Sequence, residues 1–217
     1  MRFMRLTQAC LSLTLAAVAG SALLSIALPT PALAQFSKYY KFLEAMRNRN
    51  KEADQKQLAI DALSEPGSSI VNTRDSTTGQ TALHIVTAER DLPWISYLLA
   101  HGADANARDV KGGTPLALAS TLGFAEGVQL LINGGARIDE AGGTGETPLI
   151  SAVLRRDLAM MRVLLKAGAN PDRADNSGRT ARDYARLQDR SGTLLGEIDT
   201  NAKPQSSAPK RSYGPSL

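Results

Sequence analysis

Apolar positions along the chain recur in a pattern that is typical of short paired helices. In residues 112–138, one stripe is formed by Leu116, Leu118 and Ala119, and a second by Val128, Leu130, Leu131 and Ile132. The spacing within each stripe places its members on one face of a helix. Gly123 separates the two stripes and Gly134-Gly135 follows the second, so both helices are expected to be short. The pattern predicts a helix, a tight turn and a second helix.

The same unit recurs at a fixed distance. Threonine falls at Thr81, Thr114, Thr147 and Thr180, a spacing of 33 residues held three times. Each threonine suits a helix N-cap, and Pro115 suits the first helical position, where its missing N–H would have no partner. A fixed period of this length indicates one small structural unit copied in tandem, with neighbouring units burying each other's apolar faces.

The motif residues resemble the ankyrin repeat over about residues 72–190. The resemblance rests on Thr81-Ala82-Leu83-His84, Thr114-Pro115-Leu116-Ala117, Thr147-Pro148-Leu149-Ile150 and the following Gly102-Ala103-Asp104-Ala105-Asn106. It implies an all-α solenoid of stacked helix-turn-helix units with projecting hairpin loops. It also implies a non-catalytic scaffold that binds another protein through its concave face and loop tips.

Two departures from an even repeat, and one regular packing feature, are expected to show in the fold. Arg90 and Arg156 stand where the family prefers a turn glycine, which costs about 1 kcal/mol if φ is positive there. The first projecting loop carries one residue more than the later ones. Three small residues are expected to keep neighbouring helices close, namely Ala88, Ala119 and Ala152.

An export signal is expected at residues 1–34. Arg2 and Arg5 precede an uncharged, mostly apolar run from Leu11 to Leu28, and Ala32-Leu33-Ala34 offers a cleavage site before Gln35. This signal places the protein in the periplasm.

An uncleaved membrane anchor is the alternative for this segment. A run of 18 uncharged residues reaches the lower limit for a spanning helix. Pro29 and Pro31 are expected to break the helix ahead of the cleavage site, which favours cleavage. Contact with a membrane is therefore expected only if the signal is kept.

The rest of the chain divides into three segments. Residues 35–71 are expected to form a divergent capping repeat, with Ser37 as a helix N-cap and a solvent-facing outer side that carries Lys41, Arg47, Arg49 and Lys51. Residues 72–190 hold the ankyrin repeats and end in a polar cap with Asp183, Arg186, Gln188 and Asp189. Residues 191–217 are expected to be a disordered tail, because they are rich in Pro, Ser and Gly and lack a periodic apolar pattern.

Charge and cysteine content narrow the classes of function. The chain has 25 Lys and Arg against 21 Asp and Glu, and residues 1–34 hold two of the cations and no acid, so the mature charge is +2. Such a small charge argues against a nucleic-acid partner. The only cysteine, Cys10, lies in the signal, so the mature chain has no disulfide and no thiol chemistry.

No catalytic, metal or cofactor site is expected. The two histidines, His84 and His101, lie in different parts of a repeat, whereas a metal site needs three or four converging ligands. Loop carboxylates at Asp139, Glu140, Asp172 and Asp175 offer too few oxygens for calcium and are taken as solvated turn residues. The glycines at 142, 143 and 145 lack the strand and the Lys-Ser/Thr of a phosphate loop. An enzyme and a small-molecule substrate are therefore not expected.

The candidate site is a partner-binding surface on the concave face. It combines basic residues with apolar side chains taken to be uncovered, Leu122 and Leu154, as a protein-binding patch requires. The candidate residues are Thr78, Gln80, Glu89, His101, Arg108, Val110, Lys111, Thr121, Leu122, Glu146, Leu154, Arg155, Asn176 and Arg179.

The expected function is that of a monomeric interaction scaffold in the bacterial cell envelope. Two alternatives stay open. The protein could inhibit, give immunity to or protect an exported enzyme, or it could be an adaptor tethered to the membrane or cell wall. The sequence does not identify the partner.

Overall fold

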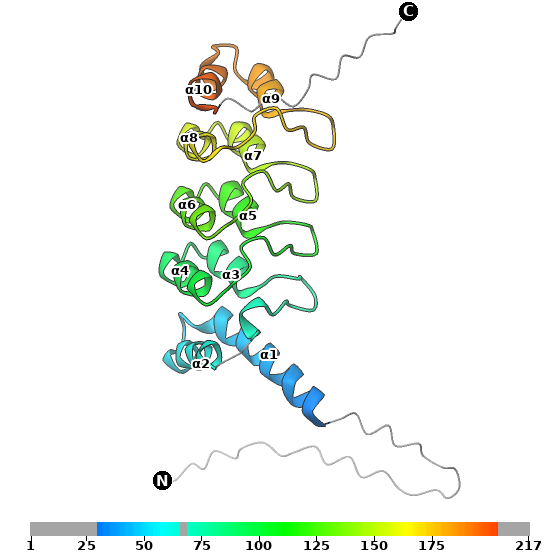
Figure 1. Cartoon of the computed structure of the whole chain (residues 1–217), viewed down its shortest axis with the longest axis vertical. Helices are drawn as coiled ribbons and strands as arrows, with labels where there is room; N and C mark the ends of the chain where they lie inside the picture. Colours follow the sequence, from blue (N-terminus) through cyan, green and yellow to red (C-terminus); the bar gives the residue numbers. More distant parts are fainter. Residues whose placement is uncertain (1–29, 66–68, 204–217) are drawn as a thin grey trace, which may run out of the picture.

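Helix pairs stacked in a single row make up the computed structural model, which describes residues 30–65 and 69–203 (Figure 1). Its elements are α1 (Thr30–Asn48), α2 (Ala53–Ser64), the short 3-10 helix η1 (Ile70–Asn72), α3 (Ala82–Ala88), α4 (Leu92–Ala100), α5 (Pro115–Thr121), α6 (Ala125–Asn133), α7 (Pro148–Leu154), α8 (Leu158–Ala167), α9 (Ala181–Gln188) and α10 (Thr193–Asn201). No strand is assigned within the described ranges. The predicted all-α repeat solenoid is confirmed.

The middle repeat shows why the sequence folds this way locally. Thr114 is the N-cap of α5, and its Oγ1 accepts a hydrogen bond from the Ala117 N–H at 3.2 Å. Pro115 is the first helical residue. Gly123 then takes a left-handed conformation with φ +64°, which lets the chain reverse into α6. The cap, proline and turn assigned from the sequence are confirmed here.

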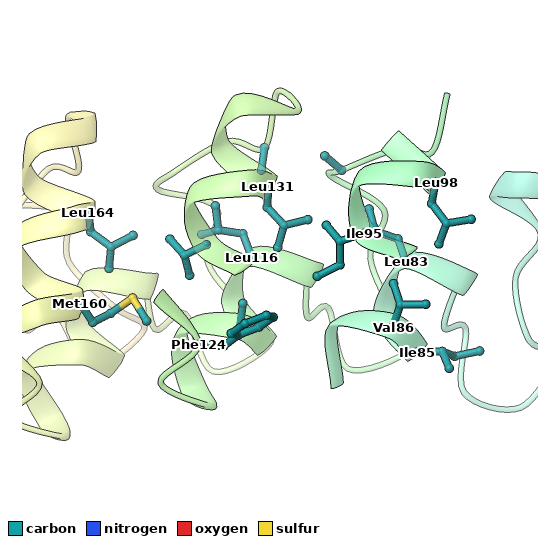
Figure 2. Packing of buried hydrophobic residues seen from close by; sticks show 14 of the residues in the cluster. Leu83, Ile85, Val86, Ile95, Leu98, Leu116, Phe124, Leu131, Met160 and Leu164 are labelled. Carbon is teal, nitrogen blue, oxygen red and sulfur yellow. The ribbon is translucent and has the colours of Figure 1, made fainter. Parts of the chain in front are cut away.

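Successive repeats bury one continuous core. The shorter inner helices α3, α5, α7 and α9 form one column beside the projecting loops, and the outer helices form the other (Figure 1). Matched leucines from each repeat, such as Leu83, Leu116 and Leu149, have no exposed surface, and neither do Leu98, Leu131 and Leu164 on the outer helices (Figure 2). Each repeat therefore stabilises the repeats on either side of it, because the apolar side chains between them are buried from water.

Ala88 departs from its expected packing role. Ala119 and Ala152 are fully buried between helices, but Ala88 is exposed. The residue 33 positions before Ala119 is Val86, which is the buried member of the row. The packing role expected of Ala88 was therefore wrong by two residues.

Two arginines hold the strained turns that the sequence predicted. Arg90 and Arg156 have φ of +58° and +55°, whereas the equivalent turn in the middle repeat uses Gly123. Each side chain still makes a contact with the next repeat. Arg90 donates to the Leu122 carbonyl, and Arg156 lies 3.5 Å from the Asp189 carboxylate. These contacts offset part of the backbone cost.

The N-terminal cap consists of α1 and α2, and it differs from the expectation at its start. α1 begins at Thr30, so Ser37 lies inside the helix and is not its N-cap. Pro31 falls in the first turn, where proline is tolerated, so the expected helix break at Pro31 was wrong. Residues 1–29, which include most of the predicted signal, lie outside the described residues.

Arg49 joins this cap to the first full repeat. It was expected on the solvent side, but only 2% of its surface is exposed. Its Nη2 lies 2.8 Å from both the Glu89 and the Asp91 carboxylates, and Nη1 donates to the Met46 carbonyl at 2.6 Å. The guanidinium carbon also lies 5.6 Å from the centroid of a ring of Trp94. The solvent-facing assignment of Arg49 was wrong because two carboxylates and an indole of the next repeat surround it.

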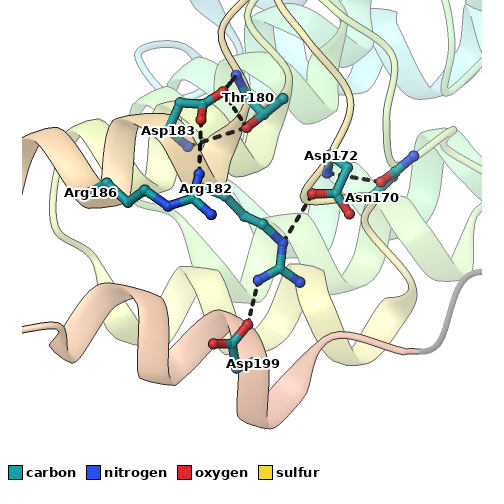
Figure 3. Close-up of polar contacts among 7 residues, drawn as sticks. All are labelled: Asn170, Asp172, Thr180, Arg182, Asp183, Arg186 and Asp199. Carbon is teal, nitrogen blue, oxygen red and sulfur yellow. Dashed lines mark hydrogen bonds and ion pairs between the residues drawn. The ribbon is translucent and has the colours of Figure 1, made fainter. Parts of the chain in front are cut away.

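The C-terminal cap has one more helix than expected. Residues 193–201, assigned to the disordered tail, form α10, where Leu194 and Ile198 are buried against α8 and α9. Arg182 of α9 contacts Asp172 at 3.0 Å and Asp199 of α10 (Figure 3). The tail assignment was therefore wrong for this helix, and residues 204–217 lie outside the described residues.

Asp189, assigned to the outer side of the polar cap, instead fixes the turn between α9 and α10. Only 6% of it is exposed, and Oδ2 accepts from the Leu194 N–H at 2.9 Å. Hydrogen bonds from Ser191 and Leu194 lower the pKa of Asp189 to about 2. The cap is thus polar where α9 begins and apolar where α10 covers it.

Candidate functional site

The projecting loops are built on one recurring turn. Asp109 Oδ1 accepts from the Lys111 and Gly113 N–H groups at 2.9 and 2.7 Å, and Asp175 Oδ1 accepts from the equivalent Ser177 and Arg179 N–H groups. These carboxylates close the loops as side-chain turns. Asp175, expected to be a solvated turn residue, therefore closes its loop.

The first loop carries the extra residue predicted from the sequence. Its base is closed by Asp75 N–H donating to the Gln80 carbonyl, and the next loop by Asp109 N–H donating to the Gly113 carbonyl. The first turn thus spans one residue more than the second. Thr78, a candidate site residue, lies in this longer turn and accepts a hydrogen bond from the Val110 N–H at 3.0 Å.

Gly142 replaces the turn aspartate in the third loop, which suggests a stabilising substitution. A Cβ built at Gly142 meets no atom within 4 Å, and its φ lies outside the left-handed region. We expect Gly142→Asp to raise the free energy of unfolding by about 1 kcal/mol, because it adds the hydrogen bonds made by Asp109 and Asp175. Urea unfolding measures the change. Gly142→Ala, which adds no acceptor, should give a smaller gain, and equal gains would contradict the turn assignment.

A row of amide side chains ties each repeat to the next below the loops. Asn72 Oδ1 accepts from the Asp104 N–H at 2.7 Å while its Nδ2 donates to the Gly102 carbonyl at 3.0 Å. Asn106 repeats both bonds in the next unit. Asp139 occupies the third position and accepts from the Asn170 N–H at 2.9 Å, but a carboxylate cannot donate. Asp139 is half-buried rather than solvated, and burial raises its pKa.

Asp139→Asn is expected to stabilise the protein at neutral pH by about 1 kcal/mol. It restores the missing donor toward the next repeat and removes a partly desolvated charge. Because the folded pKa is raised above the usual 3.8, the cost of the carboxylate is fully present at pH 7 and is relieved as pH falls toward 4.

Urea unfolding of the wild type and Asp139→Asn at pH 7 and near pH 4 tests this. The stabilisation should shrink at the lower pH. Asn106→Asp is the matched reverse control and should destabilise the protein at pH 7. If Asp139→Asn is less stable than the wild type at pH 7, the role assigned to this row of side chains is wrong.

A groove of about 580 Å³ lies between the loops and the inner helices. Four candidate residues line it: Gln80, Lys111, Thr121 and Glu146. Its floor is formed by α5 residues such as Ala117 and Leu118. The second and third loops are in close contact there, since a Cβ at Gly143 would lie 2.1 Å from the Lys111 carbonyl oxygen.

The loop tips beside the groove carry three further candidates. Val110 is 66% exposed at the tip of the second loop. Asn176 reaches the Gly143 carbonyl from the last loop at 3.4 Å. Arg108 donates to the Ala141 carbonyl and pairs with Glu140, so it mainly holds two loops together.

Most of the remaining candidate residues lie at the C-terminal ends of the inner helices. Glu89, Leu122 and Arg155 are the C-caps of α3, α5 and α7. Leu122 and Leu154 are half-buried against the core rather than uncovered as expected. The structure therefore brings these residues onto the inner side of the stack, but with less free apolar surface than expected.

His101 lies apart from the other candidates. It is the C-cap of the outer helix α4, where its Nδ1 lies 2.8 Å from the Tyr97 carbonyl. Its ring packs against Tyr97 with centroids 4.1 Å apart. The structure does not bring His101 into the groove.

A second cleft escaped the sequence reasoning. It has a volume of about 620 Å³ and lies between α1 and the first loop. Its α1 wall consists of Tyr39, Tyr40, Leu43 and Arg47, and Tyr40 is 62% exposed. The aromatic face of α1 was visible in the sequence, but it was assigned to packing within the cap.

The imidazole of His84, which lines the groove, is occupied by structural contacts. Burial lowers the pKa of His84, so its imidazole is neutral at pH 7. Its Nδ1 accepts from the Thr81 N–H at 3.2 Å, and Nε2 donates to the Gly113 carbonyl at 3.2 Å. His84 thus braces α3 against the next loop. Within residues 30–65 and 69–203, no three His, Cys, Asp or Glu side chains are grouped to hold a metal ion.

No helix in the described part of the chain has both the length and the apolar character needed to cross a bilayer.

A row of helix pairs with an open groove along the inner helices defines a repeat scaffold. The family model described as ankyrin repeats (3 copies) matches residues 44–142, and that described as ankyrin repeats (many copies) matches residues 126–185. The chain belongs to the ankyrin repeat family. Ankyrin repeats are generally non-catalytic modules for protein–protein interaction.

The chain spans only a small part of the length of the curated relatives that it matches. The chain is 38% identical over 79 residues to the glycerophosphocholine phosphodiesterase gde1 of Schizosaccharomyces pombe, covering 36% of this chain and 7% of that protein. It is 44% identical over 57 residues to the BTB/POZ domain and ankyrin repeat-containing protein NH5.2 of Oryza sativa subsp. japonica, covering 26% and 12%. The potassium channel AKT1 of Arabidopsis thaliana is 43% identical over 51 residues, covering 24% and 6%.

Proposed function

We propose that this protein is an exported interaction scaffold that binds another protein through the concave groove and loop tips. The observation that carries the proposal is the groove of about 580 Å³, which runs across neighbouring repeats and is lined by Lys111, Thr121 and Glu146. A preformed, rigid surface loses little entropy on binding, so a modest contact area gives useful affinity.

The location in the periplasm forms part of this proposal. It rests on the sequence of residues 1–34, with two arginines, the apolar run and the small-residue cleavage site. N-terminal sequencing of the protein from the cell envelope tests it. A mature chain that begins at Gln35 supports the proposal, and an intact leader shows a membrane tether instead.

Blocking the groove should abolish capture of the partner. Thr121 is exposed on the inner helix α5, so Thr121→Arg fills the groove, and Lys111→Glu reverses the charge of its wall. We expect the double variant to lose at least tenfold in affinity, as for residues at the centre of an interface. Affinity capture from envelope extract, followed by titration of the captured protein, measures the loss.

Ala159→Arg is the matched control, because it adds the same side chain to the exposed face of the outer helix α8. It should capture the partner as the wild type does. If the double variant retains every specific partner, or if only Ala159→Arg loses them, the groove is not the binding site.

A further inference from the structure

The inner helices change character between the two ends of the stack. Equivalent positions in the last turn of the four inner helices, 33 residues apart, are occupied by Ala88, Thr121, Leu154 and Leu187. Leu187 is 68% exposed, and Leu154 is half-buried on the neighbouring helix. Because α7 and α9 pack side by side, the two leucines form an apolar step at the C-terminal half of the concave face.

Tyr184 extends this step along α9. It lies three residues before Leu187, so the two side chains share a helix face. Its hydroxyl donates to Asp175 Oδ2 at 2.7 Å, and the Arg179 guanidinium carbon lies 6.0 Å from its ring centroid. The tyrosine ring is therefore held in place before any partner binds.

Three carboxylates near this step accept hydrogen bonds from backbone N–H groups. Asp157 Oδ1 accepts from the Met160 N–H, Asp183 Oδ2 from the Thr180 N–H and Asp189 Oδ2 from the Leu194 N–H. Hydrogen bonds of this kind lower the pKa of Asp183 and Asp189. These carboxylates stabilise helix caps and turns.

The cations at the step lack such partners. Among residues 30–65 and 69–203, no carboxylate lies within 4.0 Å of the guanidinium of Arg155 or Arg179. Arg155 donates only to the Thr121 carbonyl, and Arg179 only stacks on Tyr184. By contrast, Arg182 and Arg186 of α9 are neutralised by Asp172, Asp199 and Asp183 (Figure 3).

We propose that this C-terminal patch, formed by Leu154, Tyr184, Leu187, Arg155 and Arg179, binds an acidic peptide segment that places one large apolar side chain on the leucine step. The inference rests on the proposed function and adds the chemistry of the partner. Unpaired arginines supply attraction for Asp and Glu, and the exposed Leu187 beside the half-buried Leu154 supplies the apolar contact.

A peptide segment fits the patch better than a lipid surface. The loops project beyond the column of inner helices that carries the patch (Figure 1). A flat bilayer would meet the loop tips first and leave Leu187 without contact, whereas an extended or helical segment can enter between the loops.

Panning a display library of random 12-residue peptides against the full mature chain tests the inference. Selected peptides should carry Asp or Glu on both sides of a Leu, Phe or Trp. One such peptide, made synthetically and titrated by fluorescence anisotropy, should bind Leu187→Asp and Arg179→Glu at least tenfold more weakly. Leu187→Ser gives a milder loss, and thermal melts verify that each variant is folded.

Lys111→Glu separates this inference from the proposed function. If the selected peptides are not acidic, or if they lose binding to Lys111→Glu while Leu187→Asp binds normally, the scaffold binds through the central groove and the patch is wrong. Binding of the wild type to vesicles of anionic phospholipid that Leu187→Asp loses would also overturn the peptide assignment. Failure to select any peptide would count against both.

Discussion

Replacement of Arg49 by alanine is expected to lower the free energy of unfolding by about 3 kcal/mol. The guanidinium is almost fully buried and contacts the Glu89 and Asp91 carboxylates at 2.8 Å. Its removal leaves two acidic groups of the first full repeat without their counter-ion. Asp91 also caps α4, so the loss spreads from the N-terminal cap into the repeat.

Chemical unfolding of Arg49→Ala, followed by circular dichroism, measures this effect. Arg47→Ala is the matched control from the last turn of α1, two residues before Arg49, because Arg47 is exposed and makes one ion pair, with Asp75 at 2.7 Å. It should cost less than about 1 kcal/mol. If both substitutions have equal and small effects, Arg49 is not the link between the cap and the repeats.

Ile198→Ala in α10 is the second substitution with a large expected effect. Ile198 has no exposed surface and packs in the core that α10 forms with α8 and α9. Deleting a buried isoleucine to alanine costs about 2–4 kcal/mol, through lost burial and the cavity left behind. Thermal and urea unfolding should both show the loss.

Gly196→Ala in the same helix tests whether α10 is a helix at all. A Cβ at Gly196 meets no atom within 4 Å, so alanine fits and should stabilise the helix by up to about 1 kcal/mol. Opposite effects of the two substitutions are the expected pattern. If neither changes the unfolding midpoint, residues 193–201 do not form a packed helix.

The repeated part of the fold could be predicted from the sequence because each unit carries its own local signals. Thr114, Pro115 and Gly123 specify a helix start and a turn by backbone chemistry alone, and the stripe from Leu116 to Ala119 specifies the buried face. The 33-residue period then requires stacking. The positive φ at Arg90 and the longer first loop followed from the same register.

The two ends of the stack could not be predicted in the same way. The burial of Arg49 depends on carboxylates about 40 residues later, at Glu89 and Asp91, and no local pattern reveals that contact. In α10, Leu194 and Ile198 are too few to stand out from a polar segment, yet each finds a partner surface left open by α8 and α9. Long-range packing decides both cases.

The candidate site was predicted in outline. The repeat register placed Lys111, Thr121 and Glu146 around one groove. It also assigned His101 to the concave side, although His101 ends an outer helix, and it treated Leu154 as uncovered. It missed Leu187, the most exposed large apolar side chain of the described residues, because that position had been assigned to a polar cap.

Photo-crosslinking in the intact cell envelope is the most direct test of the claim that the inner face of the stack binds a partner. A photoreactive benzoylphenylalanine is placed at Thr121, on the inner helix α5, or at Ala159, on the outer helix α8. A discrete adduct from position 121 and none from position 159 is the expected result. An adduct that forms from position 159 while position 121 stays unlinked would contradict it.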